Sequence, residues 1–555
     1  MMEEYMEEKD TVDQLVTIYF DDDVNAEFHK MFLMEHSAYF EAMFSGNFLE
    51  SKAEQKIHIQ KISHRGFVMV VDCLKQKKVI VDGLEDLLTI LEVSQLLQFS
   101  FVIAESIKMI SEKYLFTINA VNVFSTVSKL GIKSLIEKSH AYILYNFKTI
   151  LVQNKAGFLK LTEDDLQTIL NNNSLNLDNE QDVFDLIINW CLVNDKYNIE
   201  YEMVVSCVRF KSMNTEQLKY CLSKTKNFNL QNVILPYLDC NTENRYSMGL
   251  FIKPIRNIPF GLCAVKNELD GYAFVYRWDW STMQFTKFIR LDPLPLDTTG
   301  YHVIVKDLDV YLMAGEIAYG RGSWNKEGWK YNLLSEQWRR LKNFTTSSRR
   351  HGVGHFVGDQ MYLLGGLTKH RVPNQNIEFF EIDKVNDTLV KIHMGSCQYF
   401  QKRVDRQFYV CLEYKGYLAI ITKDNEPAWF ELCPIDENHG YTWRRRFIHL
   451  REVVICATCY NDTVYMLTYN KKRVINLYTY NPMYELTNKL KSFNIPYDYE
   501  TTMCAFNVDK AMVFKNDTFE YYSVDNDFFI EYKIQLDHFH SNYLFSVPIY
   551  IDKTL

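Results

Sequence analysis

The sequence lacks the features of a membrane or secreted protein. It contains no apolar run that approaches the ~18 residues of a membrane-spanning helix. Its first ten residues, MMEEYMEEKD, are acidic and polar, unlike a secretory signal. The 12 cysteines are scattered without a disulfide framework, so we expect reduced, mostly buried thiols. These absences predict a soluble protein of the cytoplasm, with the nucleus as a second location, and no membrane partner.

An excess of positive charge is also missing. The formal net charge is −9, which argues against general nucleic-acid binding. At 555 residues the chain is too long for one hydrophobic core, and roughly three or four domains are expected. The 36 Tyr and 37 Phe are unusually numerous, and aromatic residues favour strands and binding surfaces.

Paired glycine occurs at a single informative place. Residues 349–366 read RRHGVGHFVGDQMYLLGG, in which an arginine pair leads into two strands that end on Gly365-Gly366. Paired glycines at a strand end suit a place where backbones crowd together. Residues 309–315 repeat the pattern of the second of these strands, and Tyr311 and Tyr362 are 51 residues apart. That spacing is the period of a kelch propeller blade, so it favours recognition over catalysis.

The hydrophobic period changes in the middle of the chain. Up to about residue 235, apolar residues recur at spacings of three and four, as in amphipathic helices. From about residue 260 the period is two, with short strands separated by Gly, Asn and Asp. The segment between them carries Pro236, Pro254 and Pro259 and is interpreted as a linker.

The first half resembles two known domains. Residues 15–44, which read LVTIYFDDDVNAEFHKMFLMEHSAYFEAMF, resemble the first hairpin and helix pair of a BTB (POZ) domain. The runs 84–97 and 102–115 fit its remaining helices. Residues 119–147 and 158–190, with Trp190 at the end, resemble a BACK domain, and this likeness continues to about residue 224.

The second half resembles a divergent six-bladed kelch β-propeller. Blades two to six are predicted to begin near Tyr301, His351, Phe408, Val453 and Thr502. Blade one is incomplete at its start, and the last strand, 543–551, is predicted to complete it, because ring closure removes two exposed edges. The fold class is thus multidomain: an α/β BTB domain at 11–116, an all-α BACK domain at 117–225, a linker at 226–259 and an all-β propeller at 260–555.

Together, the three regions resemble the domains of the BTB–BACK–kelch (kelch-like) family, whose members are substrate adaptors of cullin-3 ubiquitin ligases. The resemblance implies that the BTB and BACK domains bind the cullin-3 N-terminal region, through a hydrophobic-x-Glu motif matched by Phe48, Leu49 and Glu50. The alternative is that Phe48 packs internally while Glu50 is solvated. Only about ten residues, five of them acidic, precede Thr11, which weakens the expectation of a homodimer through the BTB domain.

Sorting the propeller loops by blade topology separates the charges. Loops between the first and second strands share one end of the propeller with those between the third and fourth, and we call this end the predicted acidic face. The other loops form the predicted basic face, which in the family holds substrates. Its candidate substrate-binding residues are Arg349, Arg350, Arg371, Arg403, Arg406, Arg444, Arg445, Arg446, Lys472 and Arg473. Clustered arginines predict a protein substrate with an acidic or phosphorylated segment, although one motif arginine can instead brace its blade.

No constellation for catalysis or for a cofactor is found. Cys456 and Cys459 have zinc-like spacing, but residues three apart in a strand point to opposite faces, which favours buried thiols. The sequence therefore predicts a non-enzymatic adaptor without metal or cofactor. The alternative function is a structural or cytoskeletal scaffold, actin-associated as some kelch proteins are, with no ligase role.

Overall fold

The computed structural model describes residues 15–45 and 57–239, Arg256, and most of the chain from 259 to 550. The gaps in this last part are 269, 280–281, 283, 370–371, 375, 384–385, 397–409, 422–427, 434–443, 451, 461, 471, 473, 497–501, 507–509, 516–517, 524–527 and 534–543. The chain divides into two compact units, 1–257 and 258–555. This division matches the change of hydrophobic period near residue 260.

The first unit begins with a small mixed domain that has a three-stranded sheet in the order β2-β1-β3. Its elements are β1 (Leu15–Phe20), β2 (Asn25–His29), α1 (Lys30–His36), α2 (Ala38–Phe44), β3 (Ile57–Ile59), α3 (His64–Gln76), α4 (Leu84–Leu96), α5 (Ser100–Met109) and the π-helix η2 (Ile110–Tyr114). Phe40, Phe67 and Phe99 are fully buried and contact one another at ring-centroid distances of 6.1 to 6.3 Å. They form an aromatic centre on which the helices pack.

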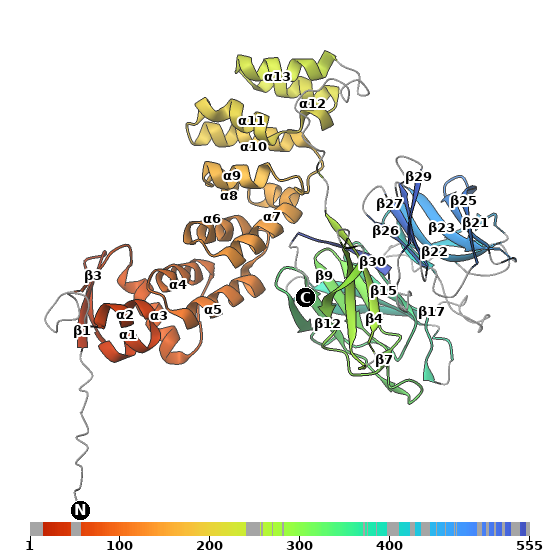
Figure 1. The fold of residues 1–555 in the computed structure, drawn as a ribbon, viewed down its shortest axis with the longest axis horizontal. Coiled ribbons are helices and arrows are strands. Elements are labelled where there is room, and N and C mark those ends of the chain that lie inside the picture. The colour runs from red at the N-terminus through yellow and green to blue at the C-terminus, as the bar shows by residue number, and fades with distance from the viewer. Residues whose placement is uncertain are drawn as a thin grey trace, which may run out of the picture. The chain divides into compact units, whose positions relative to one another are not determined.

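The rest of the first unit is helical, and its helices stack in pairs (Figure 1). They are α6 (Ala120–Leu130), α7 (Lys133–Gln153), α8 (Lys155–Leu159), α9 (Glu163–Leu170), α10 (Glu180–Val193), η3 (Tyr197–Ile199), α11 (Glu200–Cys207), η4 (Phe210–Ser212), α12 (Thr215–Lys224) and α13 (Phe228–Asp239). Capping side chains set several of their ends. Thr162 accepts from Asp165 N at the start of α9, and Asn214 forms a capping box with Gln217 at the start of α12.

Helix α13 corrects the sequence-based linker. Residues 226–259 were expected to connect the halves because of their prolines, yet Phe228–Asp239 is helical although Pro236 lies inside it. A proline removes one helix hydrogen bond and restricts its neighbours. Leu230 and Ile234 are fully buried one turn apart, and α13 packs on α12, α11 and η4. Burial of this apolar stripe outweighs the proline, so the helical region extends to Asp239.

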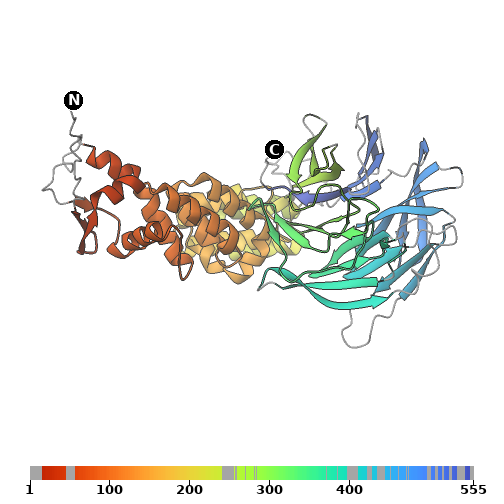
Figure 2. The same cartoon turned by 90° about the horizontal axis from the view of Figure 1, so that it is seen from below.

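The second unit is a propeller of six four-stranded sheets, coloured from green to dark blue in Figure 2. Blade one consists of β30 (Leu544–Pro548), β4 (Phe260–Asn267), β5 (Ala273–Asp279) and β6 (Gln284–Arg290). Blade two consists of β8 (His302–Lys306), β9 (Asp309–Met313), β12 (Gly328–Asn332) and β13 (Gln337–Arg340). Blade three consists of β14 (Val353–Val357), β15 (Gln360–Leu364), β16 (Asn376–Asp383) and β17 (Thr388–Ser396).

The remaining blades continue the same antiparallel order. Blade four consists of β18 (Val410–Tyr414), β19 (Tyr417–Ile421), β20 (Ala428–Cys433) and β21 (Arg444–Ile448). Blade five consists of β22 (Val453–Tyr460), β23 (Thr463–Tyr469), β24 (Val474–Asn481) and β25 (Leu486–Pro496). Blade six consists of β26 (Thr502–Phe506), β27 (Lys510–Lys515), β28 (Thr518–Ser523) and β29 (Phe528–Lys533).

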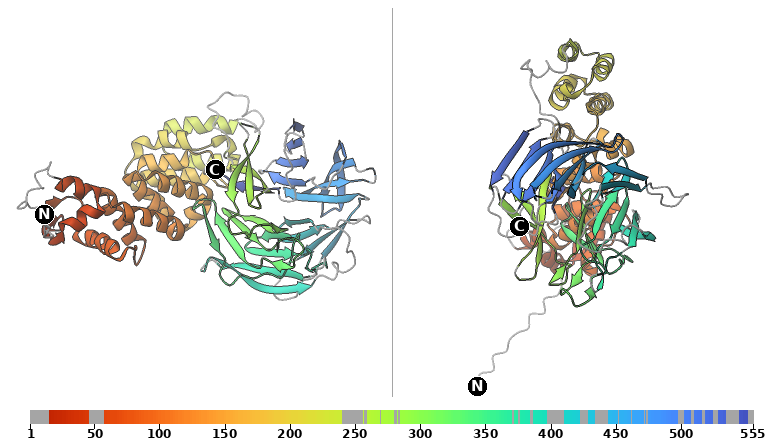
Figure 3. Two further views of the ribbon diagram at one scale, coloured as in Figure 1. Left: turned by 60° about the horizontal axis from the view of Figure 1, so that its bottom comes forward. Right: turned by 90° about the vertical axis from the view of Figure 1, so that its right-hand side faces the viewer.

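The C-terminal strand β30 pairs antiparallel with β4, from Leu544 opposite Ala264 to Pro548 opposite Phe260 (Figure 1). The first strands of successive blades contact one another around the ring, and β30 contacts both β26 and β8. The final strand therefore supplies the inner strand of blade one, as the sequence predicts. Both views in Figure 3 show the described strands of this unit as separate twisted sheets.

The paired glycines of blade three have the conformation that the sequence suggests. Gly365 and Gly366 have φ of +58° and +86°, which side-chain-bearing residues rarely adopt. A Cβ on Gly366 would also lie 2.7 Å from Arg350 O and 2.9 Å from Gly352 N. Both the backbone angle and the close approach exclude larger residues here. Among the described residues, no helix is long and apolar enough to cross a bilayer.

Candidate functional site

The predicted cullin motif, Phe48, Leu49 and Glu50, lies outside the described residues, which stop at Ser45 and resume at Ile57. Its role stays a prediction. What the structure describes nearby is α2, which ends at Phe44, and Ser37, whose side chain caps this helix and also donates to Leu97 O at 2.5 Å. The motif thus follows a helix that is fixed to the domain core.

A group of exposed apolar side chains lies where the mixed domain joins the helical region. Phe116, Ile118 and Val152 are 42%, 58% and 86% exposed. Asn154 Nδ2 donates to Ile118 O at 2.7 Å, which brings the end of α7 beside residue 118. We call Phe116, Ile118 and Val152 the junction patch. Exposed apolar groups of this kind commonly mark protein-binding surfaces.

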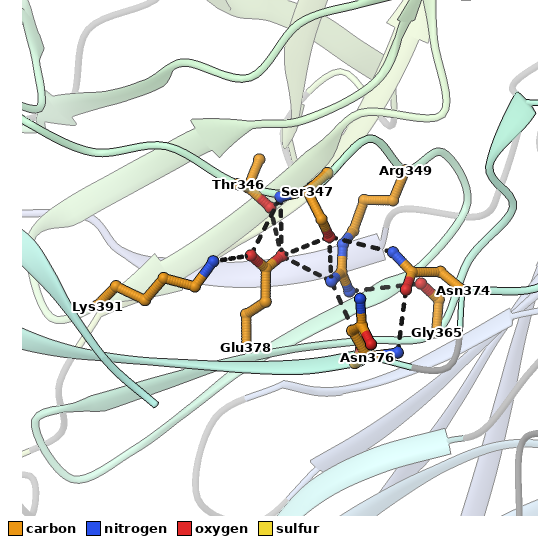
Figure 4. A network of polar contacts seen from close by, with 8 residues as sticks. All are labelled: Thr346, Ser347, Arg349, Gly365, Asn374, Asn376, Glu378 and Lys391. Carbon is orange, nitrogen blue, oxygen red and sulfur yellow. Dashed lines mark hydrogen bonds and ion pairs between the residues drawn. The ribbon is translucent and has the colours of Figure 1, made fainter. Parts of the chain in front are cut away.

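In the propeller, Arg349 has a structural role rather than the predicted binding role. Its guanidinium is fully buried, and Nη2 lies 2.6 Å from Glu378 Oε2 (Figure 4). The same carboxylate contacts Lys391 Nζ and accepts from Thr346 Oγ1 at 2.7 Å. Burial alone would raise the pKa of Glu378, but Arg349 and these hydrogen bonds lower it to about 2. A guanidinium enclosed in this way cannot contact a substrate, so this assignment is wrong.

Arg350 is likewise enclosed. Its side chain is 5% exposed and pairs with Glu316, which lies in β10 (Glu316–Ile317). This short strand pairs with β7 (Thr298–Thr299) and β11 (Ser323–Trp324). The Tyr319 ring lies 4.4 Å from the Arg350 guanidinium, and Glu316 Oε1 accepts from Gly322 N at 2.9 Å. Arg350 therefore holds the β10–β11 hairpin, and its prediction as a substrate contact is also wrong.

Residues Arg444, Arg445 and Arg446 lie toward the opposite end of the propeller from the one expected. They begin β21, the fourth strand of blade four, and Arg444 pairs with Leu432 next to the loop between the third and fourth strands. Arg446 Nη1 lies 3.7 Å from Glu485 Oε1, in the corresponding loop of blade five. Loops between third and fourth strands belong to the predicted acidic face. The three arginines are thus wrongly assigned to the predicted basic face, because they lie in β21 itself, next to the loop that precedes it, and not in a loop that follows it.

Of the other predicted contacts, only Lys472 is described, and it is exposed in the loop between β23 and β24. Arg371, Arg403, Arg406 and Arg473 lie outside the described residues. They remain predictions for the same end of the propeller.

Sequence reasoning missed an exposed group at this end. Tyr319 is 57% exposed, and Arg321 and Lys369 are exposed beside it. A Cβ on Gly322 would lie 3.5 Å from Lys369 Cε, so the blade-three lysine lies against the blade-two hairpin. We call Tyr319, Arg321 and Lys369 the hairpin cluster. The signal in the sequence was Gly320-Arg321-Gly322, an arginine between two glycines that both have positive φ.

Burial shifts the pKa of two titratable groups of the propeller, His302 and Cys459. Burial, with the nearby charges of Arg349 and His351, lowers the pKa of His302 to about 3, so this histidine is neutral near pH 7. Burial raises the pKa of the Cys459 thiol to about 11. Within the described ranges, no group of three or more His, Cys, Asp or Glu residues is arranged to hold a metal ion.

The fold therefore combines a BTB-type domain, a helical domain and a six-bladed propeller in one chain. Residues 2–114 match the BTB/POZ domain family, and residues 120–223 match the family described as "BACK: BTB And C-terminal Kelch". The chain therefore has the domain composition of BTB–BACK–kelch proteins.

Among individual proteins, the chain is 25% identical over 368 residues to Kelch-like protein 28 of Homo sapiens, covering 62% of each. It is 24% identical over 362 residues to Kelch-like protein 25 of Xenopus laevis, covering 61% of this chain and 57% of that protein. In both cases the chain spans less than two thirds of the relative's length.

Proposed function

We propose that this chain is a substrate-binding adaptor of a cullin-3 ubiquitin ligase. The observation that carries the proposal is the joining of BTB and BACK domains to a six-bladed propeller. The BTB and BACK half would bind the cullin, and the propeller would hold the substrate. Tethering then raises the effective concentration of a substrate lysine near the charged ubiquitin carrier, with no chemistry from this chain.

The junction patch supports a partner on the first unit. Phe116, Ile118 and Val152 expose apolar surface where the BTB and BACK domains meet, and a stable interface needs such a desolvated centre. We propose that this patch extends the cullin contact that the motif at Phe48 and Glu50 begins. An aromatic in a partner pocket beside a charged contact would supply most of the binding energy.

The test is binding of the purified full chain to the N-terminal region of cullin-3, measured by calorimetry. Substituting Phe48→Ala with Glu50→Ala should weaken binding at least tenfold, and Val152→Asp should also weaken it. Leu192→Asp is the matched control, because Leu192 is also an exposed apolar residue, at 56%, but lies on α10 and is not part of the patch. If the unmodified chain does not bind, the adaptor proposal is wrong and the scaffold alternative is favoured.

For the substrate, we propose a protein with an acidic or phosphorylated segment that contacts the hairpin cluster and Lys472. Three observations support this choice: exposed cations on three blades, an exposed tyrosine, and a hairpin held in shape by the Arg350–Glu316 pair. A preorganised basic surface binds carboxylate or phosphate groups with little ordering cost.

A fluorescent poly-glutamate peptide serves as the probe for this surface. Its affinity should fall with salt, and Arg321→Glu with Lys369→Glu should reduce it at least tenfold. Arg446→Glu alone, compared with Arg321→Glu alone, provides the charge-matched control, since Arg446 lies toward the other end of the propeller. Equal losses from both changes would indicate a general charge effect and would contradict the proposed surface.

A further inference from the structure

Arg256 is the one described residue between α13 and the propeller, and its side chain is buried in the BACK domain. The side chain is 5% exposed. Its Nε lies 2.6 Å from Glu180 Oε1, and its Nη2 lies 3.2 Å from Glu180 Oε2. The remaining hydrogen bonds go to backbone carbonyls: Nη1 to Leu170 O at 2.8 Å and Asn172 O at 2.7 Å, and Nη2 to Cys207 O at 2.7 Å. We call Arg256 and these partners the Arg256 cluster.

The location suits a cation because of the helix ends that meet there. Leu170 and Cys207 are the last residues of α9 and α11, whose final carbonyls lack partners within their helices. These ends carry partial negative charge, while Glu180 begins α10, where partial positive charge favours a carboxylate. Arg256 therefore satisfies two helix C-termini and one acidic side chain at once.

A second buried arginine, Arg209, lies beside the Arg256 cluster. Arg209 is 3% exposed and donates to Cys207 O and Asn171 O, each at 2.7 Å. Burial, together with the charge of Arg256, lowers the pKa of Arg209. The Glu180 carboxylate thus accepts from the Arg256 guanidinium and from the backbone N of Arg209 at 3.2 Å, while the Arg209 guanidinium donates to backbone carbonyls and to Asn173 Oδ1.

The position of Arg256 in the chain gives this contact its importance. Pro259 already belongs to the propeller, because its carbonyl accepts from Ile549 N at 2.7 Å. Only residues 257 and 258 lie between these two points. Three steps along the chain span at most about 11 Å. Without the Arg256 contact, the last described residue of the BACK domain before Pro259 would be Asp239, 20 steps earlier, and an unconstrained chain of that length has a root-mean-square span of about 25 Å.

We propose that Arg256 is a positioning residue that fixes the connection to the BACK domain and so limits the reach of the propeller. The predicted effect on ubiquitin transfer rests on the proposed adaptor function, because the reach of the propeller sets the effective concentration of a bound substrate near the ligase. Release of Arg256 should widen the distribution of distances between the two units. It should also slow ubiquitin transfer to a propeller-bound substrate by roughly tenfold, since effective concentration falls with about the −3/2 power of linker length.

The experiment uses single-molecule energy transfer in the full chain, with dyes at the exposed residues 192 and 483. Arg256→Ala should broaden the distance distribution. A second variant, with eight Gly-Ser residues inserted after residue 257, leaves the Arg256 cluster intact and should broaden the distribution as well. It keeps the proposal testable if Arg256→Ala fails to fold. An unchanged distribution in either folded variant would overturn the proposal.

Binding to cullin-3 separates this inference from the proposed function. Both variants should bind the cullin N-terminal region as the unmodified chain does, since neither changes the motif at Phe48 or the junction patch. Failure of every form to bind would contradict the adaptor function but leave the distance result intact. Glu180→Gln adds a test of the contact itself: weakened pairing should give a distribution between those of the unmodified chain and Arg256→Ala.

Discussion

Glu452 of blade five contacts Asn476 as Arg349 of blade three contacts Glu378. In each blade, a residue that precedes the first strand reaches the third residue of the third strand. Asn476 Nδ2 donates to Glu452 Oε2 at 2.8 Å, while Arg349 Nη2 lies 2.6 Å from Glu378 Oε2. Thr468 Oγ1 also donates to Glu452 at 2.5 Å. Blade five thus keeps this contact, but its charged group is a carboxylate before the first strand. The partner on the third strand is the neutral amide of Asn476.

This difference predicts unequal losses of stability. Glu378→Gln leaves the buried Arg349 and the partly exposed Lys391 without their carboxylate, and removal of one partner of a buried pair such as Arg349–Glu378 typically costs about 3–5 kcal/mol. Glu452→Gln retains an oxygen acceptor for neutral donors, so we expect a loss of about 1 kcal/mol. Urea unfolding followed by tryptophan fluorescence is suitable, because seven of the eight tryptophans follow residue 258. Equal losses would contradict the distinction between charged and neutral contacts.

Helix α13 gives a prediction with a matched neighbour. Ile234 is fully buried and Leu235 is 44% exposed, although they are adjacent in one helix. Ile234→Ala should reduce the free energy of unfolding by about 2–4 kcal/mol, through lost burial and a residual cavity. Leu235→Ala should change it by less than about 0.5 kcal/mol. Circular dichroism at the helical wavelength would follow this unit. A flexible linker at 226–239 would tolerate both changes equally.

Hydrophobic period and glycine pairing predicted the helical and the strand halves and the spacing of the repeats, because they reflect local backbone requirements, while the BTB and BACK domains were predicted from their resemblance to known domains. The strand starts of blades five and six, at Val453 and Thr502, are those of the structure. The identity of exposed side chains was harder to predict. A charged residue such as Arg349 is normally exposed, and only the position of Glu378, 29 residues away, shows that it is buried. The buried role of Arg256 was hidden for the same reason, since its partners lie 49 to 86 residues earlier.

The β30–β4 pairing predicts that the last strand is required for a stable propeller. Ending the chain at residue 543 would remove Val547, which is fully buried, and would expose the edge of β4. We expect lower thermal stability and aggregation, measured by scanning fluorimetry with light scattering. A chain that ends at residue 550 keeps β30 and is the control. Unchanged stability on removal of 544–555 would show that blade one does not need this strand.

The buried His302 predicts how propeller stability depends on pH. Burial, with the charges of Arg349 and His351, lowers its pKa to about 3, so the folded protein keeps this histidine neutral. The unfolded chain binds a proton below its ordinary value of about 6.5, so protons favour unfolding as the pH falls. The stability that neutral His302 supplies is complete above pH 6.5 and is lost progressively toward pH 3.

His302→Gln should remove this part of the pH dependence. Between pH 6.5 and pH 5, the unmodified protein should lose about 2 kcal/mol more than the variant. His449→Gln is the control, because His449 is exposed and its replacement leaves the buried site intact. Urea unfolding of the full chain at several pH values, followed by tryptophan fluorescence, measures the difference. Parallel pH curves for the unmodified protein and His302→Gln would mean that His302 is accessible to protons in the folded state.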